Sequence, residues 1–130
     1  MDVFVYGTLT EPERVGAVLD SFVFVGAAVL EGCHPVAGRY PTLAPGGETA
    51  GRLLRTAEVD ALDAYEGVDS GLYVRVSAPR TDGGTAAVYV GDPDALASEE
   101  SITWPGTGPF AERVRRYFDG GEVVVRPVHS

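Results

Sequence analysis

Glu66 is the residue whose spacing best suits acid–base chemistry in this chain. It ends a predicted helix over residues 57–66, and Gly67 follows as a stop. At helical spacing Glu66 lies on the same face as Val59 and Leu62, which we expect to point into the protein. Burial there would raise the pKa of the carboxyl group, and the negative end of the helix acts in the same direction. Such a group suits a general acid or base, whereas a helix-end glutamate that reaches into water is the alternative.

The corner Tyr6-Gly7-Thr8-Leu9, directly after the first predicted strand, is a second candidate. Gly7 lets the backbone approach a ligand closely, and a strand that turns into a helix exposes N–H groups able to bind a carboxylate. A strand that ends in glycine is common, so the corner alone is a weak signal. It is not a phosphate loop, because the chain has no G-x-x-x-x-G-K-[ST] pattern and no lysine.

Tyr73 and Arg75 are two residues apart on a predicted strand, so their side chains lie on one face. The Tyr73 phenol could donate a hydrogen bond to an oxyanion or orient Glu66, and Arg75 could hold a carboxylate. An outward-facing pair at the sheet surface is the alternative that spacing leaves open.

The remaining reactive residues form no recognisable site. Cys33 and His34 are adjacent, so on a strand their side chains point apart. With two histidines, one cysteine and no H-x-x-x-H or C-x-x-C spacing, we expect no zinc site. No G-x-S-x-G elbow indicates a serine hydrolase. A solvated loop rather than a calcium site is expected for the acidic residues Asp92, Asp94, Glu99 and Glu100.

The elements that must position these residues are short strands with a few separated helices. Strands are predicted over residues 2–6, 22–30, 50–55, 73–78, 85–90 and 123–128, and helices over 11–19, 57–66 and 110–118. Thr56 is the expected N-cap of the second helix, and Asp82-Gly83 predicts a hairpin turn. Residues 38–47 and 104–109 are rich in proline and glycine and are predicted as loops. Pro127 suggests an edge strand. The pattern favours an α+β fold on a mainly antiparallel or barrel-like sheet.

Composition limits the class of protein. A length of 130 residues suits one domain over residues 1–130, and no apolar run approaches the ~20 residues of a membrane span. The net charge of −9, with arginine as the only base, disfavours binding to nucleic acid or to anionic membranes. One cysteine and a first strand directly after Met1 predict a cytoplasmic protein. The acid excess favours a salt-rich, halophilic cytoplasm, although codon bias would also remove lysine.

Taken together, the motifs resemble the γ-glutamyl cyclotransferase-like family, in particular its small members that open with a strand and Tyr-Gly-Thr-Leu. Order and spacing agree from residue 3 to about residue 90. The matching stretches lie at residues 3–9, 40–43, 51–54, 62–67, 73–75 and 88–90.

The resemblance implies a small closed or nearly closed barrel with flanking short helices. It also implies a pocket between the corner and a catalytic Glu66. The α-amine of a γ-glutamyl compound would attack its own γ-carbonyl, releasing 5-oxoproline and an amine or amino acid. Tyr6, Gly7, Thr8 and Leu9 would bind the glutamyl group, and Tyr73 would line the pocket. No metal or cofactor is required, and the expected protein is a monomer or weak homodimer.

Departures from the family pattern leave the substrate open. Thr10-Glu11 stands where relatives often have a basic residue and glycine, and Arg52 replaces a common acid. No motif covers the region beyond residue 91, including Trp104. Two other readings therefore remain: a small-molecule binding protein that keeps the pocket without chemistry, and an interaction domain in which Glu66 is structural.

Overall fold

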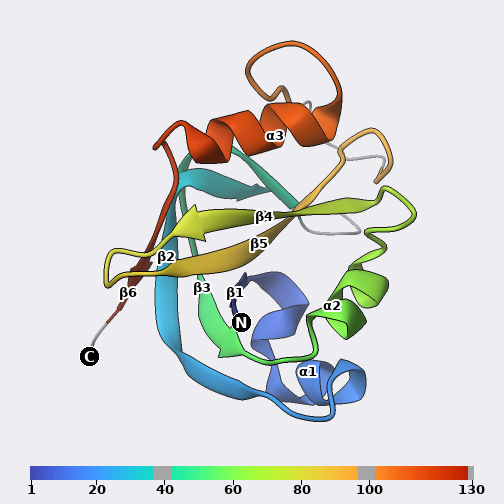
Figure 1. The fold of residues 1–130 in the computed structure, drawn as a ribbon, viewed down its shortest axis with the longest axis vertical. Coiled ribbons are helices and arrows are strands. Elements are labelled where there is room, and N and C mark those ends of the chain that lie inside the picture. Colours follow the sequence, from blue (N-terminus) through green and yellow to red (C-terminus); the bar gives the residue numbers. More distant parts are fainter. Residues whose placement is uncertain (37–41, 97–101, 129–130) are drawn as a thin grey trace.

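The computed structural model of the chain describes residues 1–36, 42–96 and 102–128. These residues form six strands, three α-helices and one short 3-10 turn (Figure 1). The strands are β1 (Asp2–Val5), β2 (Val23–Val36), β3 (Thr42–Arg55), β4 (Tyr73–Pro79), β5 (Thr85–Gly91) and β6 (Val124–Pro127). The helices are α1 (Pro12–Val18), α2 (Val59–Glu66) and α3 (Phe110–Asp119), and the 3-10 turn η1 (Gly7–Thr10) joins β1 to the start of α1.

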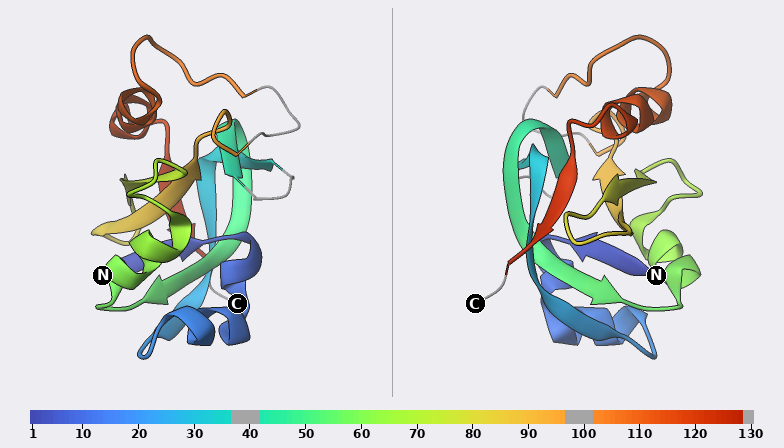
Figure 2. Two further views of the ribbon diagram at one scale, coloured as in Figure 1. Left: turned by 90° about the vertical axis from the view of Figure 1, so that its right-hand side faces the viewer. Right: turned by 60° about the vertical axis from the view of Figure 1, so that its left-hand side comes forward.

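All six strands belong to one mixed sheet with the order β4-β5-β1-β3-β2-β6. Four of the neighbouring pairs are antiparallel, and β1 with β5 is the parallel exception. The sheet curls, and its two ends meet where Arg80 bridges to Val125 and the Thr81 N–H donates to the Val125 carbonyl. Figure 2 shows this curl from two sides. The predicted nearly closed α+β barrel is confirmed, as a six-stranded half-barrel with short helices.

Strands β2 and β3 are longer than the sequence predicts. Each has 14 residues, and their pairing runs from Val23 with Arg55 to Val36 with Thr42. The predicted loop over residues 38–47 is therefore wrong for residues 42–47, which belong to β3; residues 38–41 lie outside the described residues. A shift in register between Glu31 and Cys33 accommodates the proline and glycines of this stretch.

Two groups of buried side chains hold the sheet against the helices. Against α3 lie Phe4, Leu30, Val88 and Trp104, packed with Val114 and Phe118 of that helix. Trp104, which no motif placed, is 1% exposed and belongs to this core. The second group includes Val3, Val5, Val15 of α1 and Leu62 of α2. In Figures 1 and 2, α3 covers one end of the molecule and α1 the opposite end.

Helix α2 begins at Val59, two residues later than predicted. Thr56 is not its N-cap, because it lies three residues before the first helical residue. The Thr56 hydroxyl accepts the Glu58 N–H at 3.0 Å and donates to the Ser21 carbonyl. Glu58 is the N-cap residue instead, and its carboxylate accepts backbone N–H groups of Asp20 and Ser21. The end at Glu66 is as predicted, with Gly67 in the left-handed conformation at φ 70°.

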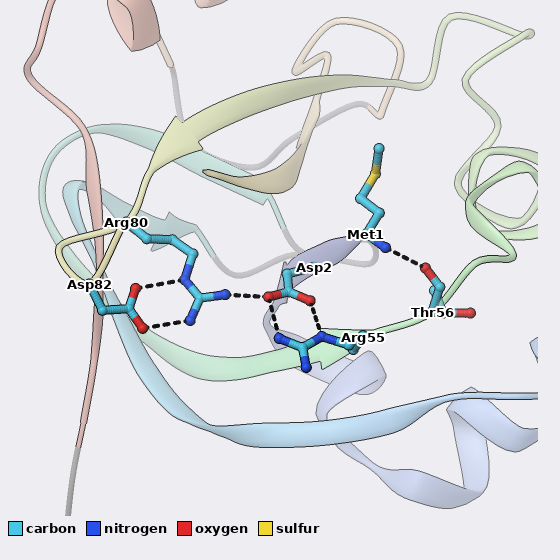
Figure 3. A network of polar contacts seen from close by, with 6 residues as sticks. All are labelled: Met1, Asp2, Arg55, Thr56, Arg80 and Asp82. Carbon is cyan, nitrogen blue, oxygen red and sulfur yellow. Dashed lines mark hydrogen bonds and ion pairs between the residues drawn. The ribbon is translucent and has the colours of Figure 1, made fainter. Parts of the chain in front are cut away.

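A cluster of ion pairs joins the first strand to the turn of the β4–β5 hairpin (Figure 3). The Arg80 guanidinium lies between the carboxylates of Asp2 and Asp82, and Arg55 makes two hydrogen bonds to Asp2, at 2.7 and 3.1 Å. Arg55, followed by Arg80, holds the pKa of the Asp2 carboxyl below its usual value. The cluster thus connects β1, β3 and the hairpin near the point where the sheet ends meet.

Several smaller expectations are confirmed. The Asp82-Gly83 step forms the β4–β5 turn, and Pro127 lies in the edge strand β6. The third helix starts at Phe110, with Val114 and Phe118 buried. None of the helices in the described ranges has the length and apolar character needed to cross a membrane.

Candidate active site

A cavity of about 400 Å³ opens between the corner after β1, the end of α2 and the starts of β4 and the loop after β5. Its polar lining comes from Tyr6, Tyr65, Glu66, Tyr73 and Tyr89. The rest of the lining is apolar and includes Phe4, Val5, Leu9, Leu72, Ala95 and Leu96. Glu66 is therefore the only carboxyl group on this wall among the residues that the structure describes, and its charge faces aromatic and aliphatic side chains.

The position of Glu66 follows from the short helix that carries it. Val59 and Leu62 are buried on the inner face of α2, so the residue one turn after Leu62 also faces inward. Glu66 is half-buried, and this burial raises the pKa of its carboxyl group to about 7. The shift agrees with the expectation from the apolar face. A carboxyl group with this pKa exchanges a proton readily near neutral pH.

Tyr6 stands on the corner side of the cavity with its hydroxyl engaged. The hydroxyl donates to the backbone carbonyl of Tyr89 at 2.5 Å. Burial is the main cause that raises the pKa of the Tyr6 phenol well above its usual value, and the neighbouring Tyr73 and Glu66 act in the same direction. Tyr6 therefore keeps its proton and serves as a donor throughout the working pH range.

The other corner residues are placed differently. Gly7 has φ 69°, a left-handed conformation in which a side chain is strained, and it starts η1. Leu9 is buried and lines the cavity. Thr8 belongs to η1, and its side chain lies outside the described part of the structure. Thr10 closes the turn with a hydroxyl hydrogen bond of 2.6 Å to the Gly7 carbonyl.

Arg52, one of the departures from the family pattern, supports the corner from β3. Its guanidinium donates to the Thr10 carbonyl at 2.9 Å and lies 3.7 Å from the centre of the Phe24 ring. The arginine therefore contacts the back of the turn and not the cavity lining.

Tyr73 and Arg75 have separate surroundings although they share a face. Tyr73 lines the cavity with Glu66. Arg75 forms an ion pair with Asp63 of α2 at 3.0 Å and lies outside the cavity wall. Four of the seven candidate residues, Tyr6, Leu9, Glu66 and Tyr73, therefore line one cavity. Gly7 and Thr8 lie in the adjoining turn η1, and Arg75 is directed to a carboxylate of the protein.

Sequence reasoning missed Tyr89 and Asp63. The Tyr89 hydroxyl donates to Asp63 at 2.6 Å, and its ring lines the cavity. Tyr89 lies directly opposite Arg75 in the β4–β5 pairing. The sequence did predict the hairpin turn between these strands, and the turn determines which residues pair across them. Counting from the turn would therefore have placed Tyr89 opposite Arg75.

The remaining reactive residues are accounted for elsewhere. Cys33 is fully buried, and burial raises the pKa of its thiol to about 12. The His34 ring lies 3.0 Å from the Gly46 carbonyl at the surface. Within the described ranges, no group of three or more histidine, cysteine or acidic side chains could hold a metal ion. Glu99 and Glu100 lie outside the described residues.

Comparison with known proteins shows which family the cavity-bearing part of the chain resembles. A family model described as "Gamma-glutamyl cyclotransferase, AIG2-like" matches residues 3–106, a stretch that contains every residue of the cavity wall. A search of curated protein sequences finds no match.

Solved structures share the fold. A protein from Arabidopsis thaliana is 29% identical, with a TM-score of 0.53 over 92% of this chain and 83% of its own. A structure named γ-glutamyl cyclotransferase is 17% identical, with a TM-score of 0.52 over 89% of this chain and 98% of its own. An uncharacterized protein from Pyrococcus horikoshii is 19% identical, with a TM-score of 0.56 over 70% of this chain and 77% of its own.

Proposed function

Since the chain belongs to the γ-glutamyl cyclotransferase, AIG2-like family, we propose that it cyclises a γ-glutamyl compound. The products are 5-oxoproline and an amine or amino acid. The observation that carries this proposal is the Glu66 carboxyl group, which has a pKa near 7 in a cavity shared with the Tyr6 corner. The assignment of Glu66 as the proton carrier rests on this geometry and on the family reaction together.

The reaction moves protons between two nitrogens of one molecule. The α-ammonium of the substrate loses a proton to the Glu66 carboxylate, and the free amine attacks the γ-carbonyl carbon to form a carbon–nitrogen bond. As the tetrahedral intermediate collapses, the bond from the γ-carbon to the leaving nitrogen breaks, and the Glu66 carboxyl group protonates that nitrogen. The ammonium gives up two protons in all and the leaving nitrogen gains two, so the reaction consumes no external acid or base.

A small site is sufficient for this chemistry. The nucleophile and the carbonyl belong to the same chain of atoms, so the protein must only fold the substrate and transfer protons. In the proposal, Tyr6, Gly7, Thr8 and Leu9 hold the glutamyl group, chiefly through backbone groups. Tyr73 lies beside the reacting carbonyl. No metal or cofactor takes part.

The test is an assay of 5-oxoproline release from a panel of γ-glutamyl amino acids and γ-glutamylamines. Glu66→Gln keeps the size of the side chain but cannot carry a proton, so kcat is expected to fall by roughly 10²–10⁴-fold. Glu13→Gln, an exposed glutamate of α1, is the matched control and should retain full activity. A Glu66→Gln variant that turns over normally would show that another group is the base.

The pH profile gives an independent check. Activity should fall on the acidic side near pH 7, because Glu66 must be ionised to accept the first proton. A limb at or below the ~4.3 of free glutamate would contradict a buried base. If the wild-type protein binds γ-glutamyl compounds but releases no 5-oxoproline from any of them, it is a small-molecule binding protein.

A further inference from the structure

Asp63 lies one turn before Glu66 on α2 and makes the polar contacts that join this helix to the sheet. Its carboxylate accepts the Tyr89 hydroxyl of β5 at 2.6 Å and pairs with the Arg75 guanidinium of β4 at 3.0 Å. The Asp63 side chain is 23% exposed and Tyr89 is 3% exposed, so the contact with Tyr89 is largely shielded from water, whereas the Arg75 side chain is 34% exposed. Charge-assisted hydrogen bonds of this length are strong and directional.

The backbone of Asp63 also determines the shape of the helix end. Its carbonyl accepts the Val68 N–H at 3.0 Å, after the left-handed turn at Gly67. Residues 63–66 form the last turn of α2, so Glu66 stands on a turn that Asp63 anchors through its backbone and its side chain.

Tyr89 connects this anchor to the opposite wall of the cavity. Its backbone carbonyl accepts the Tyr6 hydroxyl at 2.5 Å, while its own hydroxyl is held by Asp63. Burial, together with the hydrogen bond to Asp63, raises the pKa of the Tyr89 phenol, so the phenol remains a donor. One chain of hydrogen bonds therefore runs from Tyr6 on the corner, through Tyr89, to the helix that carries Glu66.

We propose that Asp63 is a positioning residue, which sets the distance between Glu66 and the Tyr6 corner by holding α2 to Tyr89 and Arg75. The inference rests on the proposed role of Glu66 as proton carrier. Asp63 does not line the cavity, so it acts through the helix and not on the substrate. A shift of about 1 Å in a catalytic group can reduce the rate of the chemical step by ~10²-fold. Loss of the Asp63 contacts should therefore lower kcat.

The experiment compares Asp63→Ala, Asp63→Asn and Tyr89→Phe with wild type, using the best substrate of the γ-glutamyl panel. We expect kcat to fall about 100-fold in Asp63→Ala and about 10-fold in Tyr89→Phe, with KM changed by less than about threefold. Asp63→Asn should lie between wild type and Asp63→Ala, because its amide oxygen still accepts the Tyr89 hydroxyl. Adding Tyr89→Phe to Asp63→Ala should cost nothing further, because the shared hydrogen bond is already lost.

Asp60→Asn is the matched control. Asp60 lies one turn earlier on the same helix and is exposed, so kcat should match wild type. An Asp63→Ala enzyme with kcat within about twofold of wild type, or a loss confined to KM, would overturn the proposal. If Asp63→Ala does not fold, Tyr89→Phe and Asp63→Asn decide by the same criteria.

A second measurement separates this inference from the proposed function. The pKa of Glu66 can be followed by carboxyl-carbon NMR without any substrate. In Asp63→Ala and Tyr89→Phe it should fall from about 7 towards 4.5, because the released helix end lets the carboxyl group reach water. If the wild-type protein releases no 5-oxoproline but the pKa of Glu66 still falls in these variants, the positioning role is supported and cyclisation is refuted. An unchanged pKa in both variants would refute the positioning role.

Discussion

The buried Glu66 carboxyl group should make the protein less stable as the pH rises, and Glu66→Gln should remove this effect. The pKa of Glu66 is about 7 in the folded chain against an ordinary 4.5. At about 1.4 kcal/mol per pH unit, this difference amounts to ~3 kcal/mol when the group is fully ionised. Because Glu66 is half-buried and not fully enclosed, the value is an upper estimate.

The direction follows from proton binding. Between pH 4.5 and about 7 the folded chain holds the Glu66 proton while the unfolded chain has released it. Folding stability therefore falls as the pH rises through this window, and it levels off above it. Glutamine does not titrate, so the stability difference between Glu66→Gln and wild type isolates the contribution of this carboxyl group.

Urea unfolding followed by tryptophan fluorescence is the assay. Trp104 is the only tryptophan and is 1% exposed, so its emission reports loss of the core directly. Between about pH 5 and pH 8.5, the stability of Glu66→Gln relative to wild type should increase by about 2–3 kcal/mol. The m-value should stay the same in both proteins, since the surface exposed on unfolding does not change.

Glu13→Gln is the control for this series as well. Glu13 is exposed, and the stability difference from wild type should stay within about 0.5 kcal/mol across the pH range. A flat difference for Glu66→Gln, or one of opposite slope, would refute the burial of Glu66. It would also remove the physical basis for a base that works near neutral pH.

Two other predictions concern stability. Asp2→Asn should lower the free energy of unfolding at pH 7 by about 1–3 kcal/mol in urea titrations, because Arg80, whose side chain is 11% exposed, would lose a charged partner. An unchanged urea midpoint would show that the ion pair contributes nothing to stability. The melting temperature should rise in molar KCl, because salt screens the repulsion among 19 acidic residues against 10 basic ones. A melting temperature equal in low and molar salt would exclude adaptation to a salt-rich cytoplasm.

The parts of the site that the sequence predicted are those that local spacing determines. Val59, Leu62 and Glu66 share a helical face over two turns, and Gly67 can end the helix without strain, so short-range rules were sufficient. The same holds for the turn at Asp82-Gly83, whose residue types suit a hairpin.

The parts that were missed depend on contacts between distant residues. Tyr89 and Asp63 are 26 positions apart, and only the packing of α2 on the sheet brings them together. Pro45, Gly46 and Gly47 carry the composition of a loop, yet β2 pairs along this stretch and extends it as strand. Thr56 has the residue type of a helix cap, but its hydroxyl donates to the distant Ser21 carbonyl, and the helix begins three residues later. In each case tertiary pairing overruled local preference.

The end of the recognisable family region and the end of the folding unit do not coincide in this chain. The match to the family model stops at residue 106, but Val114, Phe118 and Val125 complete the same interior as Phe4 and Leu30. Strand β6 also covers part of the outer edge of β2. A fragment trimmed at the limit of the family-model match would contain all the proposed chemistry yet lack one wall of its own interior. Expression boundaries for this protein should therefore be drawn from packing and not from homology.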